Sequence, residues 1–334
     1  MAGQARPPTR RTLPSNILVA TREPAARRPP PGIEGVTKRG GPAQQWAMTP
    51  TLETLEIAAN GLKFHALAAG PADGPLLLLL HGFPETSLGW RHQVGPLAAA
   101  GFRVVAPDQR GIGLSSKPAG IAAYRIDRLA ADIVAIVHAL GRERAQVAGH
   151  DWGGAVAWFL AIHHADVIER VAILDAPHPT VFESWMRAHF SQKLKSWYMA
   201  FFQLPWLPEF MLRRGGFRLL ANALVRTSRP GTFTPDDLAN YRVAWAQPGA
   251  LTAMLHWYRA LRLGVPLPTP AGPVAIPVRL LWGDKDEALE SGMADASIAL
   301  CAAGEVIHFP EATHWLAPEE PARVNALLLE FFQA

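Results

Sequence analysis

The sequence predicts an α/β fold with a mostly parallel central sheet and helices on both faces. Short continuous apolar runs, of which Leu76–Leu80 is the clearest, are typical of strands buried on both sides. Segments with helical periodicity, such as 127–140 and 154–164, fill intervals between these runs. Because 49% of the 334 residues are hydrophobic, the chain can form one large domain plus an insertion.

The predicted elements follow one another regularly from residue 52. Residues 52–58 and 62–68 alternate imperfectly across Asn60-Gly61, a dipeptide favoured in hairpin turns, and predict an antiparallel pair. Further buried strands are predicted at 76–80, 102–107, 144–149, 168–174, 278–282 and 305–309. Strands that alternate with helices in this way favour a sheet covered on both faces.

The alternation stops between His178 and about Gly264. This segment is helix-like, rich in aromatic residues and punctuated by prolines, and it contains no convincing strand. We expect residues 178–264 to form a helical cap (lid), and residues 51–177 and 265–334 to form the core. Most cap aromatics should pack against one another, while some line the cavity that the cap encloses.

Residues 1–50 differ from the rest of the chain in composition. They hold eight Lys and Arg against two Glu, a charge of +6 in a chain whose net charge is +4. The basic character therefore belongs to this tail, and nucleic acid is not expected as a partner. Its apolar stretch, Ile17–Ala20, is too short for a secretory signal. We expect a disordered tail or sequence upstream of a true start at Met48, with a transit peptide as the alternative.

The cysteine content, the apolar runs and the absence of certain motifs limit the possible cell compartment and chemistry. Cys301 is the single cysteine, which excludes an internal disulfide and fits a cytoplasmic location. No run approaches the roughly 18 apolar residues that span a bilayer. Metal and nucleotide motifs such as HExxH and the P-loop are absent, so neither a metal nor a cofactor is expected. The sequence leaves the oligomeric state open, with a homodimer as one alternative.

The stretch Ala145–Gly154 joins a predicted strand to a predicted helix around Asp151. Gly149 and Gly153 flank this residue at positions where bulky side chains would collide in a sharp turn. A carboxylate is ionised near neutral pH and needs no base to become nucleophilic. The string alone also fits an ordinary helix N-terminus, where capping and the helix dipole favour Asp.

Acidic and imidazole side chains also follow other predicted strands, at the sheet edge where parallel sheets build their sites. The relevant loops are His81-Gly82-Phe83-Pro84-Glu85, Asp108-Gln109-Arg110-Gly111, Gly283-Asp284-Lys285-Asp286 and Ala312-Thr313-His314-Trp315. A glycine-rich loop, a nucleophile, an acid and a histidine in this order are typical of the α/β-hydrolase fold.

Two strings carry a more specific resemblance. His81–Glu85 and Gly149–Gly153 resemble the two signature motifs of soluble epoxide hydrolases, and the resemblance extends from about residue 52 to the C-terminus. It implies that Asp151 is the nucleophile, Asp286 the charge-relay acid and His314 the base, without a cofactor. The substrate it implies is an epoxide, which water converts to a vicinal diol.

The implied mechanism passes through an alkyl-enzyme ester. Asp151 attacks a ring carbon, and water activated by His314 then attacks the ester carbonyl, while Asp286 stabilises the charged imidazole. The backbone N–H groups of Phe83 and Trp152 are expected to stabilise the tetrahedral oxyanion.

Ring opening also produces an alkoxide, which is far more basic than a halide and benefits from a proton donor. Tyr198 and Tyr258 stand in the strings Trp197–Gln203 and Leu255–Arg259, which match epoxide hydrolases. The resemblance therefore assigns these two phenols as the acid pair. The abundant Trp, Phe and Leu of the cap indicate a small apolar epoxide as substrate.

Several alternatives stay open at this point. Asp284 and Asp175 are alternatives to Asp286 as the charge-relay acid. A haloalkane or haloacid dehalogenase would use the same Asp nucleophile, and Arg110 keeps carboxylated substrates open. A non-catalytic ligand-binding protein of this fold is the third hypothesis. His150 and Glu85 are interpreted as structural hydrogen-bond formers.

Overall fold

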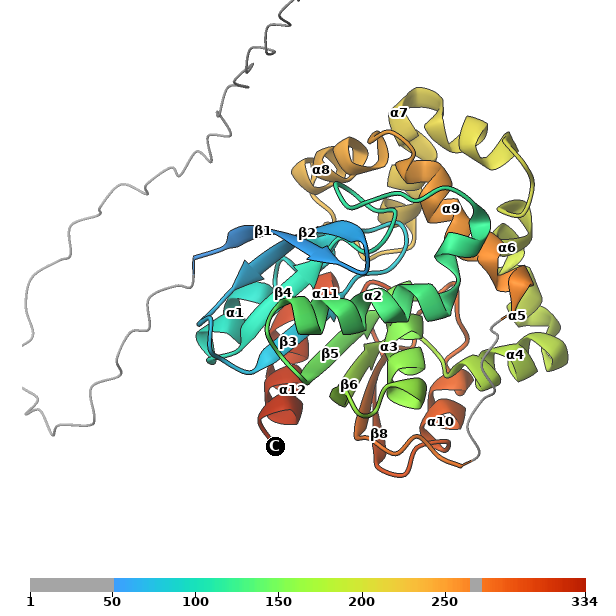
Figure 1. Ribbon diagram of the computed structural model, residues 1–334. Coiled ribbons are helices and arrows are strands. Elements are labelled where there is room, and N and C mark those ends of the chain that lie inside the picture. The colour runs from blue at the N-terminus through green and yellow to red at the C-terminus, as the bar shows by residue number, and fades with distance from the viewer. Residues whose placement is uncertain (1–50, 265–271) are drawn as a thin grey trace, which may run out of the picture. The chain divides into compact units, whose positions relative to one another are not determined.

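A computed structural model describes residues 51–264 and 272–334. The predicted tail, residues 1–50, and the first residues of the second core segment, 265–271, lie outside the described residues. The described chain is organised around an eight-stranded sheet of order β1-β2-β4-β3-β5-β6-β7-β8 (Figure 1). The strands are β1 Glu53–Ala59, β2 Leu62–Ala69, β3 Leu76–Leu80, β4 Arg103–Pro107, β5 Ala145–His150, β6 Ile168–Leu174, β7 Val278–Gly283 and β8 Gly304–Phe309.

Strand pairing confirms the predicted mostly parallel sheet. β2 runs antiparallel to both of its neighbours, β1 and β4, whereas the pairs from β4 through β8 are parallel. The register Ala59↔Leu62 closes the predicted β1–β2 hairpin, with φ of 50° at Asn60 and 71° at Gly61. These left-handed conformations explain the Asn-Gly dipeptide at this turn.

The five leucines of β3 show how the two faces are filled. Leu76, Leu78 and Leu80 belong to one buried cluster, and Leu77 and Leu79 to the other, because side chains alternate along a strand. The first cluster includes residues of α2 (Ile126–Ala139), α3 (Trp152–His163) and α10 (Gly292–Ile298). The second includes residues of α1 (Val94–Ala99) and α12 (Pro321–Gln333). The predicted three-layer arrangement is thus confirmed.

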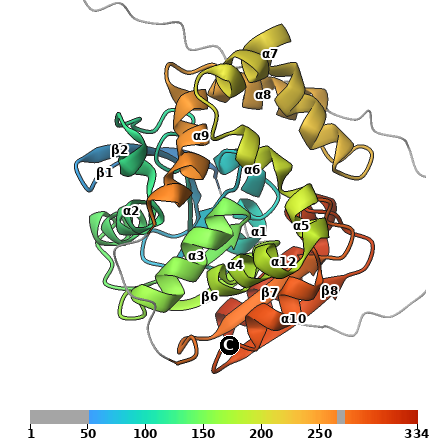
Figure 2. The ribbon, with the colours of Figure 1, turned by 90° about the vertical axis from the view of Figure 1, so that its right-hand side faces the viewer.

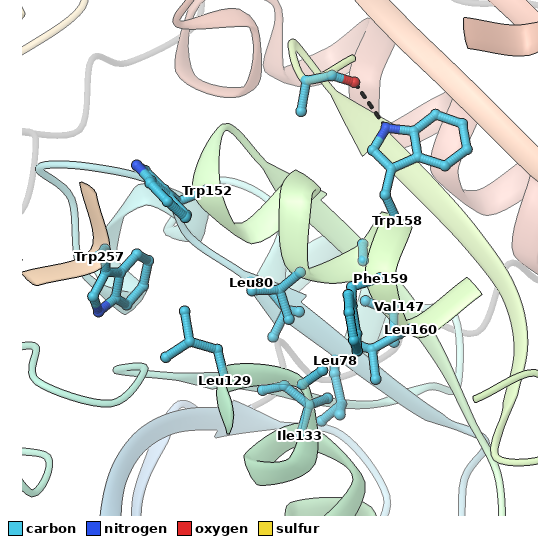
Figure 3. Packing of buried hydrophobic residues seen from close by; sticks show 14 of the residues in the cluster. Leu78, Leu80, Leu129, Ile133, Val147, Trp152, Trp158, Phe159, Leu160 and Trp257 are labelled. Atoms are coloured by element: carbon cyan, nitrogen blue, oxygen red, sulfur yellow. Dashed lines mark hydrogen bonds between the residues drawn. The ribbon is translucent and has the colours of Figure 1, made fainter. Parts of the chain in front are cut away.

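Figure 3 shows the first of these clusters around α3. Leu78 and Leu80 lie between side chains of α2 and α3, and Trp158 donates its indole N–H to the carbonyl oxygen of Ala176, 2.9 Å away. This bond joins α3 to the chain just after β6. It helps fix the helix that begins at the elbow.

Helices occupy the described chain between β6 and β7. They are α4 Pro179–Ala188, α5 Phe190–Lys195, α6 Trp197–Phe201, α7 Leu207–Arg226, α8 Pro235–Trp245, α9 Ala250–Ala260 and the 3-10 helix η3 Leu261–Leu263. α7 is interrupted at 214–217, where the backbone is not helical. Figures 1 and 2 place α6 to α9 together on one side of the sheet. This arrangement supports our proposal that residues 178–264 form a cap over a core of 51–177 and 265–334.

Three short helices complete the described elements: η1 Ser87–Trp90, η2 Ile121–Tyr124 and α11 Leu316–Glu319. Within residues 51–264 and 272–334, no helix combines the length and apolar character that crossing a bilayer requires. Nor does that part of the chain bring three His, Cys, Asp or Glu side chains into a metal-binding cluster.

Candidate active site

The sharp turn predicted at Asp151 is present. β5 ends at His150, α3 begins at Trp152, and Asp151 between them has φ 50° and ψ −117°, a strained conformation for a residue with a side chain. A Cβ atom on Gly149 would collide with the carbonyl group of Gly153. The close approach of these two backbones therefore explains the glycines around the nucleophile candidate.

Three predicted residues meet at this turn. His314 Nδ1 lies 2.7 Å from Asp286 Oδ2, and its Nε2 lies 3.6 Å from Asp151 Oδ2. The other oxygen of Asp286 accepts the backbone N–H groups of Ala288 and Leu289, at 2.6 and 2.9 Å. The imidazole is thus held between two carboxylates, one of which is itself fixed by backbone donors.

The two alternative acids, Asp284 and Asp175, have other hydrogen-bond partners. Asp284 is exposed, and its Oδ1 is 2.6 Å from Nδ1 of His308. Asp175 is fully buried after β6, where its Oδ1 accepts a backbone N–H of β7 at 2.7 Å. Of the three candidate acids, Asp286 is the one that hydrogen-bonds to His314.

Electrostatics couple the members of this group. Burial disfavours charge on His314, but the carboxylates of Asp286 and Asp151 outweigh it and raise the pKa of His314 well above its usual value. Burial likewise opposes ionisation of Asp151, yet its hydrogen bond and attraction to His314 lower the pKa of that carboxyl. The charged forms of His314 and Asp151 therefore stabilise each other in the buried site.

The loop after β3 supplies a donor to the nucleophile candidate. The backbone N–H of Phe83 lies 2.7 Å from Asp151 Oδ1. The loop is fixed by His81, whose Nε2 accepts the backbone N–H of Gln109 at 3.1 Å while its Nδ1 lies 2.9 Å from a carbonyl oxygen. Trp152 opens α3, so its N–H belongs to the first turn, where backbone donors lack helical partners.

Tyr198 and Tyr258 lie near each other on α6 and α9. Their ring centroids are 5.9 Å apart, and the Tyr258 ring also lies 5.1 Å from those of Phe83 and Trp152. Burial, and then the charge of Asp151, raise the pKa of Tyr198. Burial, the neighbouring Tyr198 and Asp151 raise the pKa of Tyr258 well above its usual value. Both phenols therefore favour the protonated form.

A buried network of hydrogen bonds lies next to the turn at Asp151, and no sequence pattern indicated how far it extends. His150 Nε2 lies 2.7 Å from the backbone oxygen of His314, and its Nδ1 lies 3.2 Å from Glu85 Oε2. Because both ring nitrogens face acceptors, both donate, and His150 is cationic. Tyr241 of α8 donates to the other Glu85 oxygen at 2.9 Å. His150 and Glu85, predicted to be structural hydrogen-bond formers, do form these bonds, and the network extends to α8.

Arg110, considered above as a binder of carboxylated substrates, is engaged elsewhere. Its Nε and Nη2 each lie 2.6 Å from an oxygen of buried Asp132, and Nη1 donates to the carbonyl oxygen of Ala123 at 2.7 Å. A guanidinium paired in this bidentate way has its charge compensated within the fold.

A second cation, Lys195 of α5, donates to the backbone oxygen of Asp286 at 3.0 Å.

Comparison with known proteins identifies the family. Residues 75–321 match the alpha/beta hydrolase fold family. The AB hydrolase superfamily protein YfhM of Bacillus subtilis is 46% identical over 277 residues, which cover 83% of this chain and 96% of that protein. Human Epoxide hydrolase 4 is 38% identical over 293 residues, covering 85% and 80%. A crystal structure of Bacillus megaterium epoxide hydrolase with an inhibitor aligns with a TM-score of 0.77 and 30% identity, covering 84% of this chain and 100% of that chain. The chain therefore belongs to the epoxide hydrolase family of the α/β-hydrolase fold.

Proposed function

We propose that this protein is an epoxide hydrolase, which converts a small apolar epoxide to a vicinal diol through an ester on Asp151. The arrangement of the site carries the proposal. The phenols of Tyr198 and Tyr258 lie near the carboxylate of Asp151. That carboxylate also faces the imidazole of His314, which hydrogen-bonds to Asp286. A carboxylate suffices to displace a halide, but the alkoxide formed from an epoxide needs a proton. Tyr198 and Tyr258 supply that function.

In the first step Asp151 acts as the nucleophile. Its Oδ1 accepts the N–H of Phe83, so Oδ2 is the oxygen that attacks a ring carbon. The carbon–oxygen bond of the ring breaks, and the ring oxygen takes a proton from the phenol of Tyr198 or Tyr258. The product of this step is an ester whose carbonyl oxygen, the former Oδ1, already lies at the backbone donor.

Esterification also prepares the base for the second step. The carboxylate charge of Asp151 is one of the influences that raise the pKa of His314, and the ester removes it. His314 can then return its proton to the tyrosinate, take a proton from water, and direct the hydroxide to the ester carbonyl.

The tetrahedral oxyanion that follows is stabilised by backbone N–H groups, of Phe83 and of Trp152. Loss of one such donor typically costs about 3 to 4 kcal/mol. Asp286 holds the imidazole orientation and stabilises its charged form, as its 2.7 Å contact allows. Collapse releases the diol and restores the carboxylate of Asp151.

Adduct trapping in a base-deficient variant tests this proposal. In His314→Gln the first step should proceed without the second, so intact-protein mass spectrometry should find the mass of one epoxide added to the chain. Asp151→Asn, the matched control, should show no adduct. An unmodified His314→Gln protein beside an active wild type would contradict the ester. Halide release from haloalkanes, without diol formation from an aryl epoxide, would instead identify a dehalogenase.

A further inference from the structure

The helices α5 to α7 carry large apolar side chains that are exposed to water. Six of them lie on α5, α6, α7 and the turn before α7: Phe190, Leu194, Trp197, Trp206, Phe210 and Met211, hereafter the apolar cap face. Phe190 and Trp206 are 72% and 71% exposed, and Trp197 is 65% exposed. Exposed apolar groups of this size and number commonly mark an interaction surface.

The spacing of these residues places them along successive helices. Phe190 and Leu194 of α5 are four residues apart, as are Trp206 and Phe210 at the start of α7, and four residues is a helical interval. Trp197 is the first residue of α6. In both ribbon views α6 lies between α5 and α7 (Figures 1 and 2). The apolar side chains therefore follow one continuous stretch of the cap.

The same stretch is strongly basic. Residues 178–264 hold eleven Lys and Arg against four Asp and Glu, a charge of +7, whereas the remainder of 51–334 has −9. Within 190–226 there are six Lys and Arg and a single acid, Glu209. That acid lies 2.6 Å from the guanidinium of Arg259, so it offsets little of the basic charge.

The positive charge of this surface limits which partners can bind there. A second copy of the chain would place one basic face against another, and residues 1–50 carry a charge of +6, so both are repelled. The four aromatic side chains could also stack on nucleic-acid bases, but Leu194 and Met211 could not, whereas the interface of a bilayer accepts all six. Trp and Phe among Lys and Arg are instead the side chains that favour the interface of an anionic bilayer.

We propose that the apolar cap face docks the protein on the surface of membranes that contain anionic lipid. The aromatic side chains enter the headgroup region, and Lys193, Arg213, Arg214 and Arg218 contact lipid phosphates. None of these side chains is among the catalytic residues proposed above, so the proposal stands whether or not that chemistry is correct.

Vesicle flotation with the full chain tests the docking. The protein should float with phosphatidylcholine–phosphatidylglycerol vesicles at low salt, and should release from them at high salt or with phosphatidylcholine alone. Trp206→Ser combined with Phe210→Ser should weaken the association about tenfold or more, since it removes two inserted aromatics. Val243→Ser, which changes a 64% exposed side chain of α8 outside this face, is the matched control and should float like wild type.

Charge reversal provides the second arm. Arg213→Glu with Arg218→Glu should abolish flotation, whereas Arg144→Glu, an exposed position of the core, should not. Circular dichroism checks that each variant is folded. The proposal is overturned if wild type fails to float with anionic vesicles, or if the Trp206 and Phe210 variant floats as well as wild type. It is also overturned if sedimentation finds a dimer that this variant dissociates, because the face then joins two copies.

Discussion

Replacing Asp175 by Asn should stabilise the protein in a strongly pH-dependent way. Asp175 is fully buried, and one of its oxygens accepts a hydrogen bond from the backbone N–H of Gly283 at 2.7 Å. The other, Oδ2, has no hydrogen-bond partner among the described residues. Burial, and next the nearby charge of Asp286, raise the pKa of Asp175 to about 8 from an ordinary 3.8. Asn keeps the acceptor for Gly283 and carries no charge.

The sign of the effect follows from proton linkage. Between the two pKa values the folded chain binds a proton at Asp175 that the unfolded chain has lost, so the free energy of unfolding falls as the pH rises. The slope for one group is about 1.4 kcal/mol per pH unit wherever the folded chain holds this proton and the unfolded chain does not. Asn carries no ionisable group, so the free energy of unfolding of the variant should not fall in this way. The variant should therefore become more stable than wild type as the pH rises.

Urea unfolding of both proteins, at several pH values across this interval, measures the difference directly. Asp284→Asn is the matched control, because Asp284 is exposed and lies beside His308. A difference in unfolding free energy between wild type and Asp175→Asn that stays constant with pH would refute the reasoning, since it would mean that Asp175 has the same pKa in the folded and unfolded chain.

Three further predictions concern the site. Tyr258→Phe and Tyr198→Phe should each lower the rate of epoxide turnover only in part, because one phenol can partly replace the other. The double variant should lower this rate on the order of 10² to 10⁴-fold, and stopped-flow measurement of ester formation checks both expectations. Asp286→Asn should lower kcat by several orders of magnitude, while Asp284→Asn should leave kcat near the wild-type value. Comparable losses of kcat for the two variants in steady-state assays would contradict the assignment of Asp286 as the acid that acts on His314. Gly149→Ala should prevent formation of the folded elbow, since its methyl group would meet backbone atoms, and soluble expression with a wild-type circular dichroism spectrum would contradict that.

Much of the fold was predictable because parallel strands buried on both faces leave a plain apolar signal. The five leucines of β3 and the run Ile168–Leu174 coincide with strands in the structure. Residues 178–264 were predictable only as helical. Its three short helices α4 to α6 and the break at 214–217 depend on tertiary packing, which local periodicity does not record.

The candidate site was predictable where chemistry is tied to a loop position. Asp151, Asp286 and His314 follow strand ends, and parallel strands bring such ends to one edge of the sheet. Contacts that depend on orientation left no such signal: the sequence could not show that Tyr241 reaches Glu85 across 156 positions, nor that Asp175 is left with an oxygen that lacks a partner among the described residues.

In the proposed mechanism the new oxygen of the diol comes from Asp151 and not directly from water. A single turnover in ¹⁸O-labelled water, with enzyme in excess over epoxide, separates the two routes by mass spectrometry of the diol and of the peptide that contains Asp151. The ester route predicts label in the Asp151 carboxylate and an unlabelled diol. Label in the diol, with an unlabelled Asp151 peptide, would contradict it.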